Sequence, residues 1–253
     1  MWQIRRLKKA ELPLLFNSSK QENWTNEEVH TTALYKAHPE DFFIAFRGNS
    51  VVGFILAIRY SDKFGFISNF LILPAFRSQG YGKKLFAFAC EHLKGSQIAL
   101  DSVSGKEKFY ENFGFSSYFD VANYVFTKGA VTLPSSELIV TSFDKDLALV
   151  SKDMYMKTMI LANRTSYKAI KSKNSISSFG FHFKYKDGYK IYIDSQEINE
   201  TVSIFFALIE DLENNTHIYM QTTPLEPLYE AVSELLKMKM YEVSVRMYNK
   251  VID

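Results

Sequence analysis

Residues 77–82, with the sequence Arg-Ser-Gln-Gly-Tyr-Gly, are the part of this chain best suited to hold a phosphate group. They lie between an apolar run at residues 66–73, which predicts a strand, and a helical pattern at residues 83–93. A glycine-bearing turn between a strand and a helix presents backbone N–H groups and the positive end of the helix dipole to an anion. Taken alone, the turn is equally consistent with a tight connection that binds nothing, because its spacing is neither a dinucleotide fingerprint nor a Walker loop.

A second motif, which follows this loop by one helix and one strand, favours the phosphate site. It spans residues 100–115 and ends in Phe-Tyr-Glu-Asn-Phe-Gly-Phe. With an opening strand at residues 4–7, Glu-Leu-Pro at residues 11–13 and Pro74 ahead of the loop, the chain resembles the GNAT family of acetyltransferases. The likeness rests on the family's Pro-x-x-Arg-x-x-Gly-x-Gly loop and its "YE-x-x-GF" signature, and the matches cover residues 4–115 in the family's order.

Within the family, the chain is most similar to bacterial two-domain members whose C-terminal half is a degenerate GNAT-like domain. It shares with them the pair Leu100-Asp101, an early Trp24 and a closing Arg246-Met247. The resemblance implies a catalytic, acetyl-CoA-binding domain over residues 1–130 and a degenerate domain over residues 137–253. A stretch with Gly, Pro and two serines at residues 127–136 is the expected linker.

The resemblance implies acetyl-CoA as cosubstrate, with its pyrophosphate on the glycine loop. Its pantetheine arm carries amide groups, which can pair with an exposed strand edge as a peptide does. Ser78 stands where relatives usually carry Gly, and Ser104 stands where many carry Asn. The implied cofactor-binding residues are Leu71, Ile72, Leu73, Arg77, Ser78, Gln79, Gly80, Tyr81, Gly82, Lys83 and Ser104.

Tyr110 is the implied proton donor of the reaction, because attack by an amine on a thioester expels a thiolate that benefits from a proton. Alternatively, Tyr110 only packs beneath the cofactor. The backbone N–H of Ile72 is expected to stabilise the oxyanion that forms.

The general base is less clearly marked. Some relatives place Glu on the strand before the loop, where this chain has Ser68 and Asn69. Asp101 at the end of the next strand is the remaining candidate. Alternatively, Asp101 orients the following loop by hydrogen bonds, and the amine loses its proton through a chain of water molecules.

Trp24 and Tyr35 lie in or near the segment that usually lines the acceptor site in this family. Trp24 offers an aromatic face to a cationic amine, or else packs over the sheet. The expected acceptor is a small-molecule or peptide amine. His182 and His217 lack metal-ligand spacing, so no metal site is expected.

Composition restricts the class of partner and compartment. The chain has 253 residues, enough for two domains, and a net charge of +2, which disfavours nucleic acid as a partner. Its single cysteine, Cys90, suits a reducing compartment, and no apolar stretch reaches the ~18 residues of a membrane span, so the cytoplasm is expected. Composition does not indicate the oligomeric state.

The two halves of the chain show the same rhythm of strands and helices, with hairpins before a single crossover. The expected fold is therefore mixed α/β, with tandem GNAT-type folds, each a twisted mixed sheet flanked by helices. In the second half, Asp-Ser-Gln-Glu at residues 194–197 replaces the glycine loop, and its two acids would repel a pyrophosphate. Residues 166–172 read as a further helical turn or two, and Lys168, Lys171 and Lys173 form a basic run that is expected on a solvated helix face.

These observations lead to two readings from different classes. The first is an acetyl-CoA-dependent N-acetyltransferase that acts on a primary amine by direct attack in a ternary complex. The alternative is a non-catalytic acyl-CoA sensor or partner-binding module, motivated by the missing acidic base and the degenerate second half. An enzyme acting on tRNA or ribosomes is a third option, which the near-neutral charge weakens.

Overall fold

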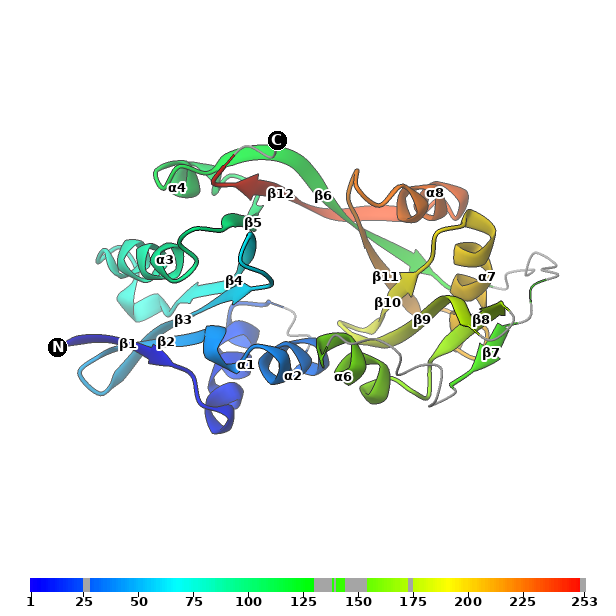
Figure 1. The fold of residues 1–253 in the computed structure, drawn as a ribbon, viewed down its shortest axis with the longest axis horizontal. Helices are drawn as coiled ribbons and strands as arrows, with labels where there is room; N and C mark the ends of the chain where they lie inside the picture. The colour runs from blue at the N-terminus through cyan, green and yellow to red at the C-terminus, as the bar shows by residue number, and fades with distance from the viewer. Residues whose placement is uncertain (25–27, 130–137, 139, 144–153, 173–174, 251–253) are drawn as a thin grey trace. The chain divides into compact units, whose positions relative to one another are not determined.

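The computed structural model of the chain describes residues 1–24, 28–129, 138, 140–143, 154–172 and 175–250. These residues form two compact units. Unit 1 comprises Met1–Phe119 together with Ser244–Asp253, and unit 2 comprises Asp120–Val243. Each unit contains a mixed sheet with helices packed on it, which confirms the expected fold class (Figure 1). Within the described ranges, no helix has the length and apolar character needed to cross a membrane.

Unit 1 is an antiparallel sheet that continues through one parallel crossover. Its strands follow the order β1-β2-β3-β4-β5-β12, in which only β4 and β5 are parallel. The elements are β1 (Trp2–Arg6), α1 (Leu12–Gln21), α2 (Glu28–Ala37), β2 (Phe42–Arg47), β3 (Ser50–Arg59), β4 (Phe64–Ile72), α3 (Tyr81–His92), β5 (Gln97–Val103), α4 (Glu107–Glu111) and the last residues of β12 (Lys239–Tyr248), with short 3-10 turns at Lys9–Glu11, Pro39–Asp41 and Pro74–Phe76.

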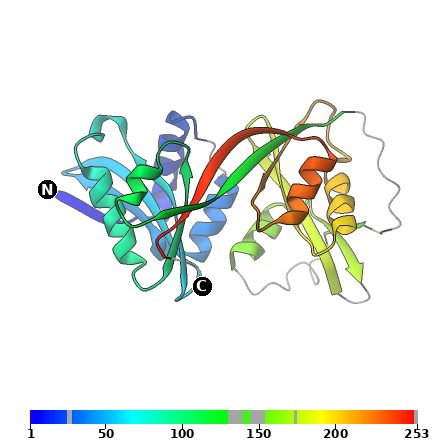
Figure 2. The same cartoon turned by 90° about the horizontal axis from the view of Figure 1, so that it is seen from above.

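Helices cover both faces of the unit 1 sheet (Figures 1 and 2). Neighbouring residues of a strand point to opposite faces, and two neighbours in β2 show which helix lies on which face. The ring of Phe42 lies 5.1 Å from that of Tyr35 on α2, whereas the ring of Phe43 lies 4.9 Å from that of Phe88 on α3. Helices α2 and α3 therefore pack on opposite faces.

The core beneath α3 also packs against α4, the helix of the second sequence motif. Leu85, Phe86 and Ala89 recur at helical spacing on α3 and are fully buried. The ring of Phe86 contacts that of Tyr110 on α4, with centroids 5.2 Å apart. The packing of α3 on the sheet thus also fixes the position of α4.

Unit 2 repeats this pattern of hairpins followed by one parallel crossover. Its order is β6-β11-β10-β9-β8-β7, with β10 and β11 parallel. Buried apolar residues of α7, among them Ile204 and Phe205, form its core with the strands. The elements are β6 (Ser116–Thr127), β7 (Val140–Ser142), α6 (Met154–Ala162), β8 (Lys168–Ser172), β9 (Ser175–Tyr185), β10 (Gly188–Asp194), α7 (Ile198–Ile209), β11 (His217–Thr222) and α8 (Pro227–Leu235).

The closing strand of each unit comes from the other half of the sequence. Strand β6 follows α4, yet residues 122–127 pair with β11 in unit 2. Strand β12 follows α8, yet residues 244–248 pair with β5 in unit 1. The units therefore divide differently from the expected 1–130 and 137–253, because the edge groups of β5 and β11 find their hydrogen-bond partners in the opposite half. The expected linker lies mostly outside the described residues.

One expected element is wrong. Residues 166–172 do not form a helical turn, because Lys168–Ser172 is strand β8, paired with β7 on one side and β9 on the other. Its residues Ala169 and Ile170 are 1% and 4% exposed, so pairing and burial override the helical spacing of the lysines. Lys168 and Lys171 thus lie on a strand, and Lys173 lies outside the described residues.

Candidate active site

The parallel strands β4 and β5 are paired only at their beginnings. Their register runs from Phe64 opposite Gln97 to Ile67 opposite Leu100, and no pairing continues beyond it. Asn69 has a φ of 46°, and the register with β3 shifts at this point, as in a β-bulge. The second half of β4 is therefore bound to β3 on one side and leaves its other edge open toward β5.

The backbone N–H of Ile72 lies on this open edge. The N–H of Leu73 donates to the carbonyl of Val52 in β3 at 2.9 Å. Because successive N–H groups of a strand point to opposite sides, the N–H of Ile72 points away from β3. The same alternation directs the N–H of Leu71 toward β3. Of the three residues predicted to contact pantetheine, Leu71, Ile72 and Leu73, only Ile72 therefore offers its N–H to the open side.

The glycine loop connects this edge to the N-terminus of α3. Gly80 has a φ of 80° and Ser78 a φ of 59°, so both adopt the left-handed conformation. The N–H of Lys84 donates to the carbonyl of Gly80 at 3.3 Å, which is the first bond of the helix. The N–H groups of residues 81–83 precede it and are available to an anion.

Arg77 braces this loop against the strand. Its Nε donates to the carbonyl of Ile72 at 2.9 Å, and its Nη2 forms an ion pair of 2.6 Å with Glu22, the residue that follows α1. Gln79 is held in the same manner, since its amide donates to the carbonyl of Ala75 at 2.9 Å. These two predicted cofactor residues thus shape the loop in this structure.

Tyr81 and Gly82 open helix α3. The ring of Tyr81 stacks on Trp2 with centroids 5.0 Å apart, so its side chain is part of the packing. A Cβ at Gly82 would lie 3.6 Å from the Phe70 ring and 3.7 Å from Ile72, which are ordinary contacts. Only Gly80 of the two glycines uses a positive φ, so Gly82 is not required by the fold.

Tyr110 lies on α4 with its ring edge against Phe86 and Phe109. Burial raises the pKa of Tyr110 above its usual value, so the phenol carries its proton at neutral pH. In the described part of the chain, no hydrogen bond to its hydroxyl is found, whereas its carbonyl accepts from the N–H of Phe113 at 2.8 Å. The backbone is fixed and the hydroxyl remains available as a donor.

Asp101 is engaged by an arginine. It lies directly opposite Arg246 in the pairing of β5 with β12, and Arg246 donates to both of its carboxylate oxygens, from Nη2 at 3.1 Å and from Nε. The Arg246 guanidinium also lies 5.1 Å from the centre of the Phe66 ring. Burial lowers the pKa of Arg246, but the hydrogen bond and charge of Asp101 raise it above its usual value. Both carboxylate oxygens are thus occupied by Arg246, which counts against Asp101 as base.

The remaining predicted residues lie around this centre. Ser104 is exposed in the turn between β5 and α4, which the N–H of Lys106 closes on the carbonyl of Val103 at 3.0 Å. Trp24 is 38% exposed beyond the end of α1. The hydroxyl of Tyr35 donates to the carbonyl of Leu7 at 3.1 Å, so this side chain holds α2 to the chain after β1. No cluster of His, Cys, Asp or Glu in the described ranges has the arrangement of a metal site.

Sequence reasoning missed two partners of the site. Glu22 and Arg246 bind predicted site residues, but neither belongs to a local motif around the loop. Arg246 was noted as part of the closing Arg246-Met247 pair, and its position 145 residues after Asp101 gave no indication of their contact.

The corresponding turn of unit 2, between β10 and α7, holds a carboxylate side chain of the protein itself. Glu200 in the first turn of α7 accepts hydrogen bonds from Ser177 at 3.1 Å and from Ser178. Ser178 also donates to Ser195 at 3.0 Å. A carboxylate already lies where the first unit presents lysines and free N–H groups, which supports the expectation that unit 2 does not hold a pyrophosphate there.

Comparison with known proteins agrees with the family expected from the sequence motifs. Residues 4–115 match the model of the acetyltransferase (GNAT) family. Holothin acyltransferase from Pseudoalteromonas sp. (strain SANK 73390) is 23% identical over 104 residues, which are 41% of this chain but 35% of that protein. The match thus leaves most of the length of that relative uncovered.

Solved structures of similar fold extend over the whole chain. A protein from Pyrococcus horikoshii, described as a putative acetyltransferase, has a TM-score of 0.76 at 13% identity, with 99% of this chain and 90% of that chain covered. A GCN5-related N-acetyltransferase from Sphaerobacter thermophilus has a TM-score of 0.67 at 10% identity, covering 98% and 95%. A tandem GNAT protein from the clavulanic acid biosynthesis pathway has a TM-score of 0.66 at 11% identity and is covered completely, as is this chain.

The fold of the whole chain is similar to that of a tandem GNAT protein, and each of its two units has one parallel crossover. Residues 4–115 are a domain of the GNAT family of acyl- and acetyltransferases, which confirms the family expected from the sequence motifs.

Proposed function

We propose that this chain is an N-acetyltransferase that transfers the acetyl group of acetyl-CoA to a primary amine. The observation that carries the proposal is the open edge of β4, where the outward N–H of Ile72 precedes the glycine loop. The loop fits a pyrophosphate, because Gly80 turns the chain into α3 and the N–H groups of residues 81–83 precede its first bond. Lys83 and Lys84 supply the opposing charge.

The residues of unit 1 have distinct roles in this proposal. The open edge of β4 pairs with the pantetheine amides, and the N–H of Ile72 stabilises the oxyanion that forms on the thioester carbonyl. The protonated phenol of Tyr110 gives its proton to the departing thiolate. Because Arg246 occupies both oxygens of Asp101, we assign the deprotonation of the amine to water.

The acceptor is proposed as a small-molecule or peptide amine. The exposed face of Trp24 suits a cationic group. The pairing of Asp101 also keeps the second reading, a non-catalytic acyl-CoA sensor, as the alternative to be tested.

Calorimetry with acetyl-CoA and with coenzyme A tests the loop, and a thiol-release assay over a panel of amines tests the chemistry. We expect one binding site per chain and thiol release that depends on the amine. Binding without thiol release for any amine would favour the sensor, and two sites per chain would contradict the assignment of unit 2. Absence of binding would overturn both readings.

A further inference from the structure

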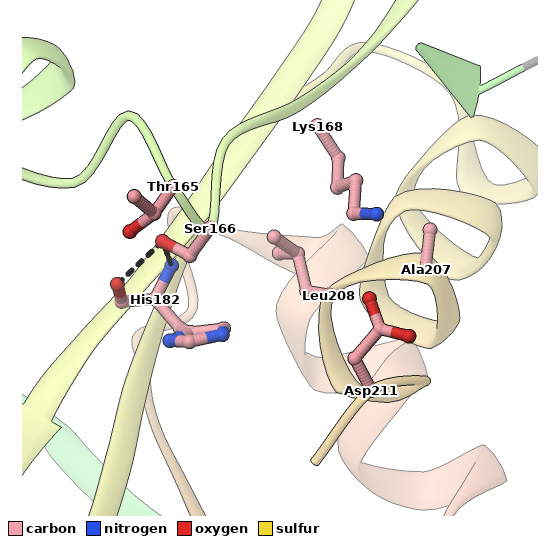
Figure 3. Close-up of a pocket in the computed structure, with 7 residues that line it drawn as sticks. All are labelled: Thr165, Ser166, Lys168, His182, Ala207, Leu208 and Asp211. Atoms are coloured by element: carbon pink, nitrogen blue, oxygen red, sulfur yellow. Dashed lines mark hydrogen bonds between the residues drawn. The ribbon is translucent and has the colours of Figure 1, made fainter. Parts of the chain in front are cut away.

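A cavity of about 110 Å³ lies in unit 2, away from the turn between β10 and α7. Its walls come from the turn before β8, from β8 and β9, and from the C-terminal part of α7 (Figure 3). Lys168, His182 and Asp211 contribute polar groups, and Ala207 and Leu208 contribute an apolar wall. None of these residues takes part in the proposed transfer reaction.

His182 is fixed in place, with its ring edge-on to that of Tyr189 at 4.5 Å between centroids. Ser166 clamps its backbone, because the Ser166 hydroxyl donates to the His182 carbonyl at 2.7 Å and accepts from its N–H at 3.1 Å. The buried Nδ1 of the ring has no hydrogen-bond partner in the described ranges. Figure 3 shows the tip of this ring in the space between β9 and α7.

The imidazole of His182 is neutral at physiological pH. Burial, with the charges of Lys184 and Lys168, lowers its pKa to about 4. A buried N–H without an acceptor is rarer than an unpaired acceptor, which favours the tautomer with the proton on Nε2, at the tip of the ring.

Lys168 and Asp211 bring opposite charges to the same cavity. Lys168 is half-buried, and its ammonium, like the Asp211 carboxylate, faces the space next to Ala207 (Figure 3). Across the described residues, neither group forms an ion pair of 4.0 Å or less. The cavity is thus lined by two donors, Lys168 and His182, and by one acceptor, Asp211.

We propose that this cavity binds a small amino acid in its zwitterionic form, of the size of glycine or alanine. The carboxylate of the ligand accepts from Lys168 and His182, and its ammonium donates to Asp211. A ligand with only a negative charge would be repelled by Asp211, and a ligand with only a positive charge would be repelled by Lys168. The volume leaves room for a side chain of at most a few atoms.

Titration of the full chain with glycine or L-alanine, followed by calorimetry and by 15N-histidine NMR, tests this site. We expect one site per chain, a shift of the His182 ring resonances, and at least tenfold weaker binding of acetate and of methylammonium, which each carry one half of the charge pair. The absence of binding by either amino acid would overturn the proposal, as would acetate binding as tightly as glycine.

Two variants and a matched control locate the binding. Lys168→Met and Asp211→Asn should each weaken glycine binding at least tenfold, whereas Glu210→Gln, which changes the neighbouring exposed acid outside the cavity, should leave it unchanged. Melting curves establish that each variant is folded. Equal affinity of all three variants would place any binding elsewhere and refute the site. Acetyl-CoA binding is measured separately. A failure of amino-acid binding to this cavity would therefore not contradict the proposed transfer reaction.

Discussion

Arg246 and Asp101 are separated by 145 residues and form a bidentate ion pair across the β12–β5 ladder. Their side chains are only 18% and 24% exposed. The pair joins the C-terminal strand to the strand that precedes the "YE-x-x-GF" helix. It also removes the one carboxylate that sequence reasoning had offered as a base.

Asp101→Asn should therefore act on stability more than on catalysis. We expect the free energy of unfolding to fall by about 1–3 kcal/mol, because the Arg246 charge loses its partner in a half-buried place. Turnover at saturating amine should change less than about tenfold, an effect too small for the loss of a general base. Chemical denaturation and steady-state kinetics measure the two effects. A hundredfold loss of turnover with unchanged stability would restore Asp101 as the base.

Tyr110→Phe should lower turnover by at least about tenfold while acetyl-CoA affinity stays the same, because only the proton donor is lost. The ring contacts with Phe86 and Phe109 remain in the variant. Tyr118→Phe makes the same chemical change at an exposed position of unit 1 and serves as control. Equal turnover of the Tyr110 variant and the control would remove Tyr110 from the mechanism.

Gly82→Glu should abolish acetyl-CoA binding by placing a carboxylate at the anion site in the first turn of α3. Gly82→Ala is the matched control, since its Cβ would make only ordinary contacts with Phe70 and Ile72. Calorimetry on both variants, with melting curves for folding, makes the comparison. If the glutamate variant is folded and still binds acetyl-CoA, the loop assignment fails.

The ion pair of Arg5 with Glu11 should make stability depend on pH. The hydrogen bond from Arg5 lowers the pKa of Glu11 from 4.5 to about 2 in the folded chain. The stabilisation is therefore complete above pH 4.5 and is lost as the pH falls from 4.5 to about 2.

Denaturation of the parent chain and of Glu11→Gln across this range tests the prediction. The difference in their free energies of unfolding should shrink toward pH 2. Glu91→Gln, which alters a pair with 71% and 75% exposed side chains, should show little difference at any pH. A difference for Glu11→Gln that does not vary with pH would contradict the pKa shift.

Much of unit 1 could be predicted because its signals are local. The strand before the loop, the turn at Gly80 and the helix after it follow from apolar spacing and glycine placement over residues 66–93. In unit 2, the dipeptide Asp187-Gly188, a common hairpin turn, likewise predicts the β9–β10 hairpin. The helical prediction for residues 166–172 was wrong because a local pattern does not show that this segment pairs with a strand on each side.

The sequence by itself determined the family motifs, the mixed α/β class and the order of most elements, because periodicity and turn residues act within a few positions. The tertiary structure decided which strand closes each unit, which partner Asp101 has, and which N–H of β4 faces outward. It also brought Lys168, His182 and Asp211 to one cavity. These features depend on hydrogen bonds and packing between segments far apart in the chain, and no local pattern encodes them.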